Sequence, residues 1–368
     1  MKKKKVLVIS KSKEDPSAFY RLIQYLENFE NVWCAYLFSD RVYRKYYDRN
    51  TTILEKALAG IRVEWMAICT ILWDRIVYRS EILIINRKIF PRYCPRFMKR
   101  SLKRYLEEKY VIWDFDDNIF QNGEISITEL HVYEDTADKV VVANAFLKSL
   151  LCAGLQKKTD LLPTTDRDLE DVCLQKYRHR RKALFHTNIN LIWMGTGGNL
   201  VFLEQIAGQL EQAAKEIRDK EVTLFVISNL PFRTKRAFRY LKVQNVRWTR
   251  DGARKLMTAM HIGLMPLKEN AFTKGKAAFK AVQYIGAGLP VIASPVGFNR
   301  VVVEDGKNGF LTDFEWAERI RYLSGSFEKW EVYSNCARKH WEENFNSRRN
   351  LQYWKDVIGN DQQTGEIR

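Results

Sequence analysis

The sequence predicts an α/β protein made of two successive Rossmann-like halves. Short apolar runs of strand length alternate with segments of helical periodicity, which is typical of βα units around a mainly parallel sheet. This alternation stops at the basic stretch 176–182 and restarts at 189. A length of 368 residues also fits two domains. We therefore expect one domain over 1–182, a second over 183–345, and a terminal helix and tail over 346–368 that packs on the first domain.

The first half contains a series of apolar runs that we interpret as strands. The first run is followed by Asp15, Pro16 and Ser17, which provide helix-breaking and capping chemistry before a helix over 19–29. A long apolar helix is expected over 52–79, and a basic amphipathic helix over 92–109. The expected strands are 6–9, 33–38, 82–85, 110–117, 139–143 and 161–163.

The second half repeats this pattern, with helices expected over 200–219 and 276–287. Ligands of such sheets bind beyond the carboxyl ends of the strands, and a cleft between two domains is a common active site. We therefore expect the active site in a cleft between the two halves. The expected strands are 189–195, 222–227, 246–248, 261–265, 290–293 and 309–311.

The composition limits the partners and the location of the protein. Sixty-one Lys and Arg against 44 Asp and Glu give a net charge of +17, which favours nucleic acid, anionic lipid or phosphorylated small molecules. The basic residues are scattered rather than interleaved with stacking aromatics, so we do not expect nucleic acid to be the partner. No apolar run reaches the ~20 residues of a membrane span, and the basic N-terminus lacks a signal-peptide core. These features predict a cytoplasmic protein.

The cysteines do not form a recognisable site. No two are spaced as a Cys-x-x-Cys pair, so neither zinc nor a disulfide framework is expected. We interpret them as reduced, mostly buried thiols. They are Cys34, Cys69, Cys94, Cys152, Cys173 and Cys336.

The segment 274–310 has the chemistry of a phosphate site. Lys276 and Lys280 lie at the start of the expected helix, where the helix dipole already disfavours cations. Lysines in that position are explained if an anion shares the site, because a helix N-terminus binds phosphate. A turn from Ser294 to Gly297 then lets the backbone approach a ligand. The alternative is a solvated basic helix start followed by an ordinary turn.

This segment resembles the nucleotide-sugar-binding element of GT-B glycosyltransferases, close to glycosyltransferase family four. That family has a Gly-x-Pro-Val-x-Ala-Ser run, a following Gly, and then an acidic-Gly-x-x-Gly run. The resemblance implies a GT-B fold, with two Rossmann-like domains facing across a cleft, the donor in the second domain and the acceptor in the first. The matching residues are Gly288, Pro290, Val291, Ala293, Ser294, Gly297, Glu304, Asp305, Gly306, Gly309 and Phe310.

Two departures from the family pattern affect the donor site. Gly275 and Gln283 stand where the family has its pair of Glu residues. Gln283 can still contact the ribose, whereas Gly275 cannot contact the donor sugar. We therefore expect Lys276, as a catalytic residue, and Lys280 to stabilise the diphosphate leaving group without a metal or another cofactor. The expected donor-binding residues are Gly275, Lys280, Gln283, Ser294, Gly297, Trp248 and Arg250.

The acidic run after the 110–117 strand is the expected acceptor side. Asp114 and Asp116 form an Asp-x-Asp pair, which holds a metal in GT-A transferases but is a weak signal alone. The resemblance instead places this run facing the cleft, where Asp116 or Asp117 would orient an acceptor hydroxyl or take its proton. Asp114 and Arg21 are expected to bind the acceptor. The alternatives are a cap and turn that close the strand, and a structural salt bridge for Arg21.

The resemblance implies a retaining transfer of a sugar to a glycan or lipid-linked acceptor, in cell-surface polysaccharide or glycolipid synthesis. The basic segments 41–49 and 92–109 would hold the enzyme on the anionic inner face of a membrane, although 92–109 fits a solvated helix packed on the sheet equally well. Two alternatives remain: a sugar-nucleotide epimerase on the same fold, and a catalytically silent scaffold that lacks the Glu pair.

Overall fold

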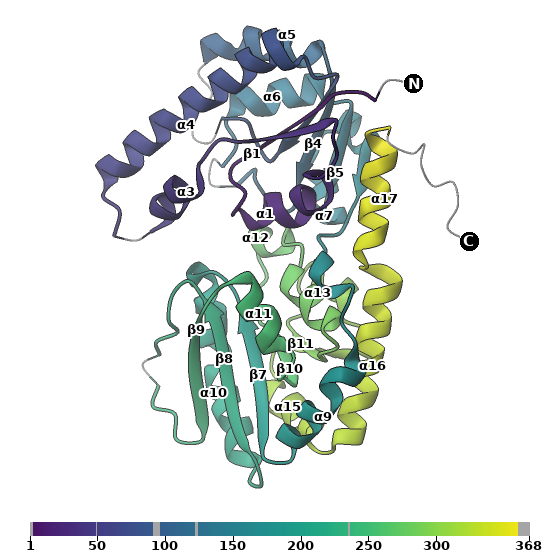
Figure 1. Cartoon of the computed structure of the whole chain (residues 1–368). Helices are drawn as coiled ribbons and strands as arrows, with labels where there is room; N and C mark the ends of the chain where they lie inside the picture. Colours follow the sequence, from purple (N-terminus) through teal and green to yellow (C-terminus); the bar gives the residue numbers. More distant parts are fainter. Residues whose placement is uncertain (1–2, 49, 91–95, 122–123, 235, 360–368) are drawn as a thin grey trace, which may run out of the picture. The chain divides into compact units, whose positions relative to one another are not determined.

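The computed structural model describes residues 3–48, 50–90, 96–121, 124–234 and 236–359 (Figure 1). The chain forms two compact units. The first unit comprises Met1–Thr164 and Ser347–Arg368, and the second unit comprises Thr165–Asn346. The chain therefore enters the second unit at Thr165, before the expected boundary at 182–183. The expected boundary lies inside helix α9 (Leu174–Phe185), whose residues Arg181 and Phe185 are buried in the second unit.

The first unit is a parallel sheet with the strand order β2-β1-β3-β4-β5-β6. Strand β6 lies two residues earlier than expected, since Pro163 lacks the N–H that a strand needs. The other strands lie close to the expected runs, and the apolar side chains of β1, β3, β4 and β5 are largely buried, whereas the edge strand β2 is mostly half-buried. The strands are β1 (Val6–Ser10), β2 (Val32–Tyr36), β3 (Ile82–Asn86), β4 (Tyr110–Phe115), β5 (Lys139–Val142) and β6 (Thr159–Leu161).

The helices of the first unit include the last helix of the chain. Trp354 and Ile358 at the C-terminus pack in the same core as Val6 and Ile84, so α17 completes the first unit. The helical segments are α1 (Pro16–Ala18), η1 (Phe19–Ile23), α2 (Gln24–Leu26), α3 (Asp40–Tyr47), α4 (Ile53–Trp73), η2 (Asp74–Tyr78), η3 (Arg96–Met98), α5 (Lys99–Glu107), α6 (Ile127–Thr136), α7 (Ala145–Ser149), α8 (Ala153–Lys157) and α17 (Ser347–Val357).

The second unit is also a parallel sheet, with the order β12-β11-β10-β7-β8-β9. Strand β9 begins five residues before the expected start, because it is an edge strand whose exposed polar residues hide its pattern. Its strands are β7 (Asn188–Met194), β8 (Glu221–Ser228), β9 (Leu241–Arg247), β10 (Ile262–Met265), β11 (Val291–Ala293) and β12 (Gly309–Leu311).

Two apolar cores pack the helices against the second sheet; one contains Ile292 of β11, and the other contains Val291 and Ala293 of the same strand. His261 is buried against the rings of Phe185 and Trp330 in the first of these cores. Burial lowers its pKa to about 3, so it is a neutral structural residue. The helical segments are η4 (Arg167–Leu169), α9, η5 (Gly197–Asn199), α10 (Leu200–Glu216), α11 (Arg250–Met257), α12 (Ala271–Lys274), α13 (Phe279–Gly286), α14 (Asn299–Val302), α15 (Trp316–Ser324) and α16 (Phe327–Asn344).

The structure corrects two expectations about side-chain exposure that were based on the sequence. Part of the basic helix expected over 92–109 lies outside the described residues, and in its described part the apolar side chains of Leu102, Tyr105 and Leu106 are buried within the first unit. These three side chains therefore pack on the protein, whereas Phe97, which was expected on the same side, is exposed. Cys94 also lies outside the described residues. The five described cysteines are free but half-buried or exposed, so the expectation of mostly buried thiols is wrong.

Candidate functional site

The second sheet has a point at which its strand order reverses. The chain runs outward from β7 to β8 and β9, and then returns to place β10 on the other side of β7. Loops that leave neighbouring strands in opposite directions create a crevice at the carboxyl ends of those strands. The loops after β7 and β10 span 195–199 and 266–270, and the loop after β11 begins at Ser294. These loops define the donor side of the candidate site.

Three polar side chains near this crevice form a hydrogen-bonded chain. The ammonium of Lys280 donates to Oε1 of Gln283 over 3.1 Å, and Nε2 of Gln283 donates to Oδ2 of Asp166 over 2.6 Å. Gln283 and Asp166 are buried, whereas Lys280 is half-buried. These bonds use one acceptor and one donor position of the Gln283 amide, so Gln283 orients Lys280, while its expected contact with a ribose stays a prediction.

The electrostatics of this chain favour an anionic ligand. Desolvation lowers the pKa of Lys280 to about 8, and the more distant Asp166 carboxylate only partly opposes this shift. Burial raises the pKa of Asp166, although the hydrogen bond from Gln283 acts in the other direction. The charge of Lys280 is thus incompletely compensated by the protein. A phosphate placed against this ammonium would stabilise its charged form.

The lysines upstream of α13 lie differently from the expected arrangement. The helix expected over 276–287 begins only at Phe279, as α13, because Ala278 adopts a left-handed conformation with φ of 49° at its N-cap. Lys276 therefore precedes the helix, and its ammonium lies 4.4 Å from the ring centroid of Phe272. Lys274 forms an ion pair of 2.7 Å with Glu269. Among the expected lysines, Lys280 alone occupies the first turn of α13 in the described chain.

The loop after β11 supports the segment that carries these lysines. The hydroxyl of Ser294 accepts a hydrogen bond of 3.0 Å from the backbone N–H of Leu267. Gly297 has φ of 52°, and a Cβ at this position would lie 2.6 Å from the carbonyl oxygen of Lys274. Ser294 and Gly297 therefore hold the loop after β10 and the turn at Gly275, the C-cap of α12, in place.

Trp248 and Arg250 lie at the other end of this row of loops. They follow β9, which is four strands from β11 in the sheet, or about 19 Å at the usual strand spacing. Trp248 packs against the core of the second unit, and Arg250 begins α11. They border the crevice on the β9 side and do not join the cluster around Lys280.

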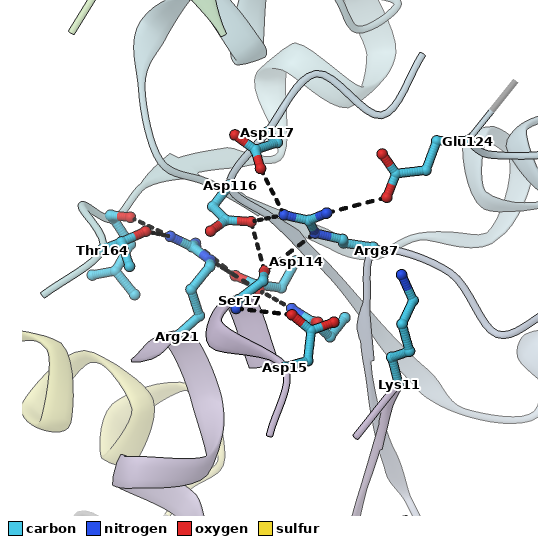
Figure 2. A network of polar contacts seen from close by, with 12 residues as sticks. Lys11, Asp15, Ser17, Arg21, Arg87, Asp114, Asp116, Asp117, Glu124 and Thr164 are labelled. Carbon is cyan, nitrogen blue, oxygen red and sulfur yellow. Dashed lines mark hydrogen bonds and ion pairs between the residues drawn. The ribbon is translucent and has the colours of Figure 1, made fainter. Parts of the chain in front are cut away.

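The first sheet has its own reversal point, between β1 and β3. The residues that follow these strands and β4 form a charged network (Figure 2). Arg87, directly after β3, donates to Asp116 over 2.9 Å, to Asp117 over 2.8 Å and to Glu124 over 3.1 Å. Arg87 has φ of 63°, an uncommon conformation for a residue other than Gly. The network places carboxylates at the carboxyl edge of this sheet.

The guanidinium of Arg87 determines the protonation states of the groups in this network. Burial opposes the charge of Arg87, but Asp116, Asp117 and Glu124 outweigh it and raise the pKa of Arg87 well above its ordinary value. Burial likewise acts to raise the pKa of Asp116, but Arg87, Arg21 and a 2.6 Å hydrogen bond from Ser17 together lower it. Asp116 is thus ionised and suited to accept a hydrogen bond, not to take a proton as a general base. Asp117 is more exposed than Asp116.

Arg21 and Asp114 form a buried ion pair instead of an acceptor site. Nη2 of Arg21 lies 2.6 Å from Oδ1 of Asp114, and Nη1 donates to the carbonyl oxygen of Leu162 and the hydroxyl of Thr164. Arg21 is 1% exposed and Asp114 is 0% exposed. Burial opposes the charge of Arg21, but Asp114 overcomes this effect and raises the pKa of Arg21. The acceptor-binding role expected for this pair is therefore wrong, because neither side chain can reach a ligand in this structure.

Comparison with known proteins gives a match within the second unit. The model of the family described as glycosyl transferases group 1 matches residues 192–325. The matched segment includes Lys276, Lys280, Gln283 and the loop after β11, whereas Asp166 precedes it.

Solved structures establish the fold of the whole chain. HepE from Anabaena, in complex with UDP and glucose, is 12% identical with a TM-score of 0.64, covering 97% of this chain and 100% of HepE. Sucrose-phosphate synthase from Thermosynechococcus elongatus is 14% identical with a TM-score of 0.65, covering 97% of this chain and 98% of that protein. The fold is GT-B, as the sequence resemblance implied.

One curated relative matches over a short stretch. Spore coat protein SA of Bacillus subtilis (strain 168) is 46% identical over 66 residues, which cover 17% of this chain and 18% of that protein. The match spans less than a fifth of either protein, so it supports a local resemblance and not a shared activity of the whole chains.

Sequence reasoning missed two residues that organise the candidate sites. Arg87 follows the expected strand 82–85, and a charged residue at a carboxyl strand end could have suggested its place. Asp166 had no local signal for its hydrogen bond to Gln283, which is 117 residues away. Among the described residues, no group of His, Cys, Asp or Glu could hold a metal ion, and no helix has the length and apolarity needed to cross a membrane.

Proposed function

We propose that this protein is a glycosyltransferase that moves a sugar from a nucleotide diphosphate sugar to a glycan or lipid-linked acceptor. The observation that carries the proposal is the half-buried ammonium of Lys280, with its pKa lowered to about 8, in the first turn of α13 within the segment that matches the group 1 model. A lysine with an incompletely compensated charge at a helix N-terminus is suited to a diphosphate.

On the donor side, Lys280 stabilises the charge that develops on the leaving diphosphate, and Gln283 holds its ammonium in place. Lys276, in the turn before α13, contributes a second positive charge. We propose that these two lysines supply the charge that a metal supplies in other transferases, so that the reaction needs no metal. The Asp114 and Asp116 carboxylates support this part of the proposal, because each is already paired with an arginine.

On the acceptor side, Asp116 and Asp117 orient the hydroxyl group of the acceptor. Arg87 keeps Asp116 ionised, and an ionised carboxylate accepts a hydrogen bond from a hydroxyl. Asp117 is the more accessible of the two carboxylates. The catalytic contribution of this side is positioning of the acceptor, which is worth a large part of the barrier in transfer reactions.

The donor we propose is a UDP-sugar, because HepE is solved in complex with UDP-glucose. We further propose that the sugar is a hexose or a related sugar, that transfer proceeds with retention, and that the product belongs to cell-surface polysaccharide or glycolipid synthesis. The short match to a spore coat protein supports the last point. We propose that donor and acceptor bind at loops that follow the described strands, and that the reaction requires no cofactor other than the donor substrate.

A nucleotide screen tests the donor side. The thermal midpoint of the full chain is measured with UDP, GDP and CDP and with UDP-glucose, since a ligand that binds the native state stabilises it by mass action. We expect UDP and UDP-glucose to raise the midpoint and Lys280→Met to abolish the increase, while Lys339→Met on the exposed side of α16 retains it. If no nucleotide raises the midpoint of the unmodified chain, the proposal is wrong.

A second measurement separates transfer from the alternative activities. Release of UDP from UDP-glucose is followed with and without a mixed pool of glycan and lipid-linked acceptors. Transfer predicts release that depends on acceptor and falls in Asp117→Asn, with nucleotide binding unchanged. Conversion of the donor without any acceptor would indicate an epimerase, and binding without any turnover would indicate a silent scaffold.

A further inference from the structure

Helix α4 of the first unit presents an apolar outer face. Its buried side is a narrow strip of small residues, Gly60, Val63, Ala67 and Thr70, which pack against the rest of the unit. Large apolar side chains on the opposite side are exposed, including Ile61 at 67% and Trp65 at 63%. Isolated exposed apolar residues are common in proteins, but a continuous apolar face is not.

The exposed residues follow one line along the helix. Their spacing of four, three, four and seven residues places them within about 60° of one another around the helix axis, opposite to the buried strip. Ile76 continues the line into η2, where it is also exposed. We call this line the outer stripe of α4. It consists of Leu54, Leu58, Ile61, Trp65 and Leu72.

Positive charge accompanies the outer stripe. Arg62 is exposed beside it, and Arg75 and Arg79 are exposed at its C-terminal end. Arg75 is paired with Glu108 over 2.7 Å, and at the N-terminal end, where α3 lies next to α4, Lys45 is paired with Glu55 over 2.7 Å (Figure 1). Arg62 and Arg79 are therefore the exposed cations beside the stripe that form no ion pair with another described residue. Arginine and lysine beside an apolar surface can extend to the headgroups while the stripe enters the hydrocarbon.

We propose that the outer stripe of α4 inserts into the surface of a membrane that contains anionic lipid. The net charge of +17 attracts the protein to such a surface and repels a second copy of itself. Trp65, which is 63% exposed, provides an aromatic side chain of the kind that favours the interface between headgroups and hydrocarbon. The hydrocarbon of a bilayer can also surround an irregular row of side chains, whereas a protein partner would need a surface that matches it.

This inference differs from the sequence-based expectation, which assigned membrane contact to residues 41–49 and 92–109. In the described part of 92–109, Leu102, Tyr105 and Leu106 are buried and cannot enter a bilayer, which leaves Phe97 as its exposed large apolar side chain. The inference is independent of the proposed transferase activity, because it concerns only a surface of the first unit.

Vesicle flotation of the full chain tests the inference at low salt. The vesicles are phosphatidylcholine alone, or phosphatidylcholine with a quarter of phosphatidylglycerol. We expect binding to the anionic vesicles, with the partition coefficient of the double variant Ile61→Gln/Trp65→Gln at least about tenfold lower. The matched control is Val201→Gln/Phe314→Gln, which removes two exposed apolar side chains from the second unit and should leave binding unchanged.

Three outcomes would overturn the inference. One is equal binding of the stripe variant and the unmodified chain, and another is equal binding to both kinds of vesicle. The third is a dimer in the absence of vesicles that the stripe variant dissociates, which would assign this face to a second copy. Because the assay contains no nucleotide, each outcome leaves the nucleotide screen unaffected.

Discussion

Lys280 combines a depressed pKa with a position in the first turn of a helix. Desolvation lowers the pKa to about 8, while a nucleotide diphosphate would favour the charged form. Binding of the anion and protonation of Lys280 are therefore linked, and each should strengthen the other. Arg21 shows the opposite arrangement, with a buried charge fully compensated inside the protein.

We predict that the affinity for UDP falls as the pH rises through about 8, because the free protein then loses the proton of Lys280. Between about pH 7 and 9 the phosphate charge is constant, since its last pKa is near 6. In Lys280→Met the dissociation constant should be at least about tenfold higher at neutral pH, with this pH dependence removed. Calorimetric titration checks this, with Lys339→Met as the control that keeps the slope; an unchanged slope in Lys280→Met would contradict it.

We predict that Arg21→Met lowers the free energy of unfolding by about 3–5 kcal/mol, because it leaves the Asp114 carboxylate buried without its partner. The control is Arg44→Met, which removes an exposed ion pair with Glu14 and should cost less than about 1 kcal/mol. Urea unfolding of both variants measures the difference. Equal costs would show that the buried pair is not a stabilising element of the first unit.

At the scale of elements, the loop after β11 and the turn before α13 form one structure. Gly297 brings the loop against the backbone of Lys274, and Ser294 binds the backbone of Leu267. The sequence predicted a turn here from Ser294 and Gly297, but the contact with Lys274 depends on the parallel pairing of β10 and β11. The helix expected over 276–287 starts only after Ala278, whose left-handed conformation forms the turn before α13.

We predict that Gly297→Ala destabilises the protein more than Gly306→Ala does. Both glycines have positive φ, 52° and 75°, so each substitution should cost about 1 kcal/mol through the backbone. A Cβ at Gly306 meets nothing within 4 Å, whereas a Cβ at Gly297 meets the carbonyl oxygen of Lys274 at 2.6 Å. Thermal unfolding of the two variants isolates this steric cost. Equal midpoints would mean that the loop moves away freely.

At the scale of the whole molecule, the chain leaves the first unit at Thr164 and returns to it at Ser347. The return is fixed by α17, where the indole of Trp354 is fully buried and donates to the carbonyl oxygen of Arg21 over 3.0 Å. The N-terminal half of the chain therefore does not contain all of its own core. This explains why the units do not follow the linear division at 182–183.

We predict that Trp354→Ala destabilises the first unit by about 3–5 kcal/mol, because it leaves a cavity in the core that contains Val6 and Ile84. Hydrogen exchange of the full chain should show faster exchange in β1 and β3, with β7 and β10 unchanged. Gln352→Ala, at an exposed position of the same helix, should leave every strand protected. Uniform loss of protection across both sheets would contradict the assignment of α17 to the first unit.

The sequence alone determined the α/β class, most of the strands and the glycine turns between Gly288 and Phe310, because buried parallel strands are continuous apolar runs and glycine turns have local signatures. The tertiary structure decided which polar groups meet. Arg87 meets Asp116 because β3 and β4 are neighbours in the sheet, and Asp166 meets Gln283 of α13, which is 117 residues away along the chain. It also decided that Arg21 is buried and that the outer side of α4 is exposed. Local periodicity reports that a segment has an apolar face, whereas the partner of that face depends on residues far along the chain.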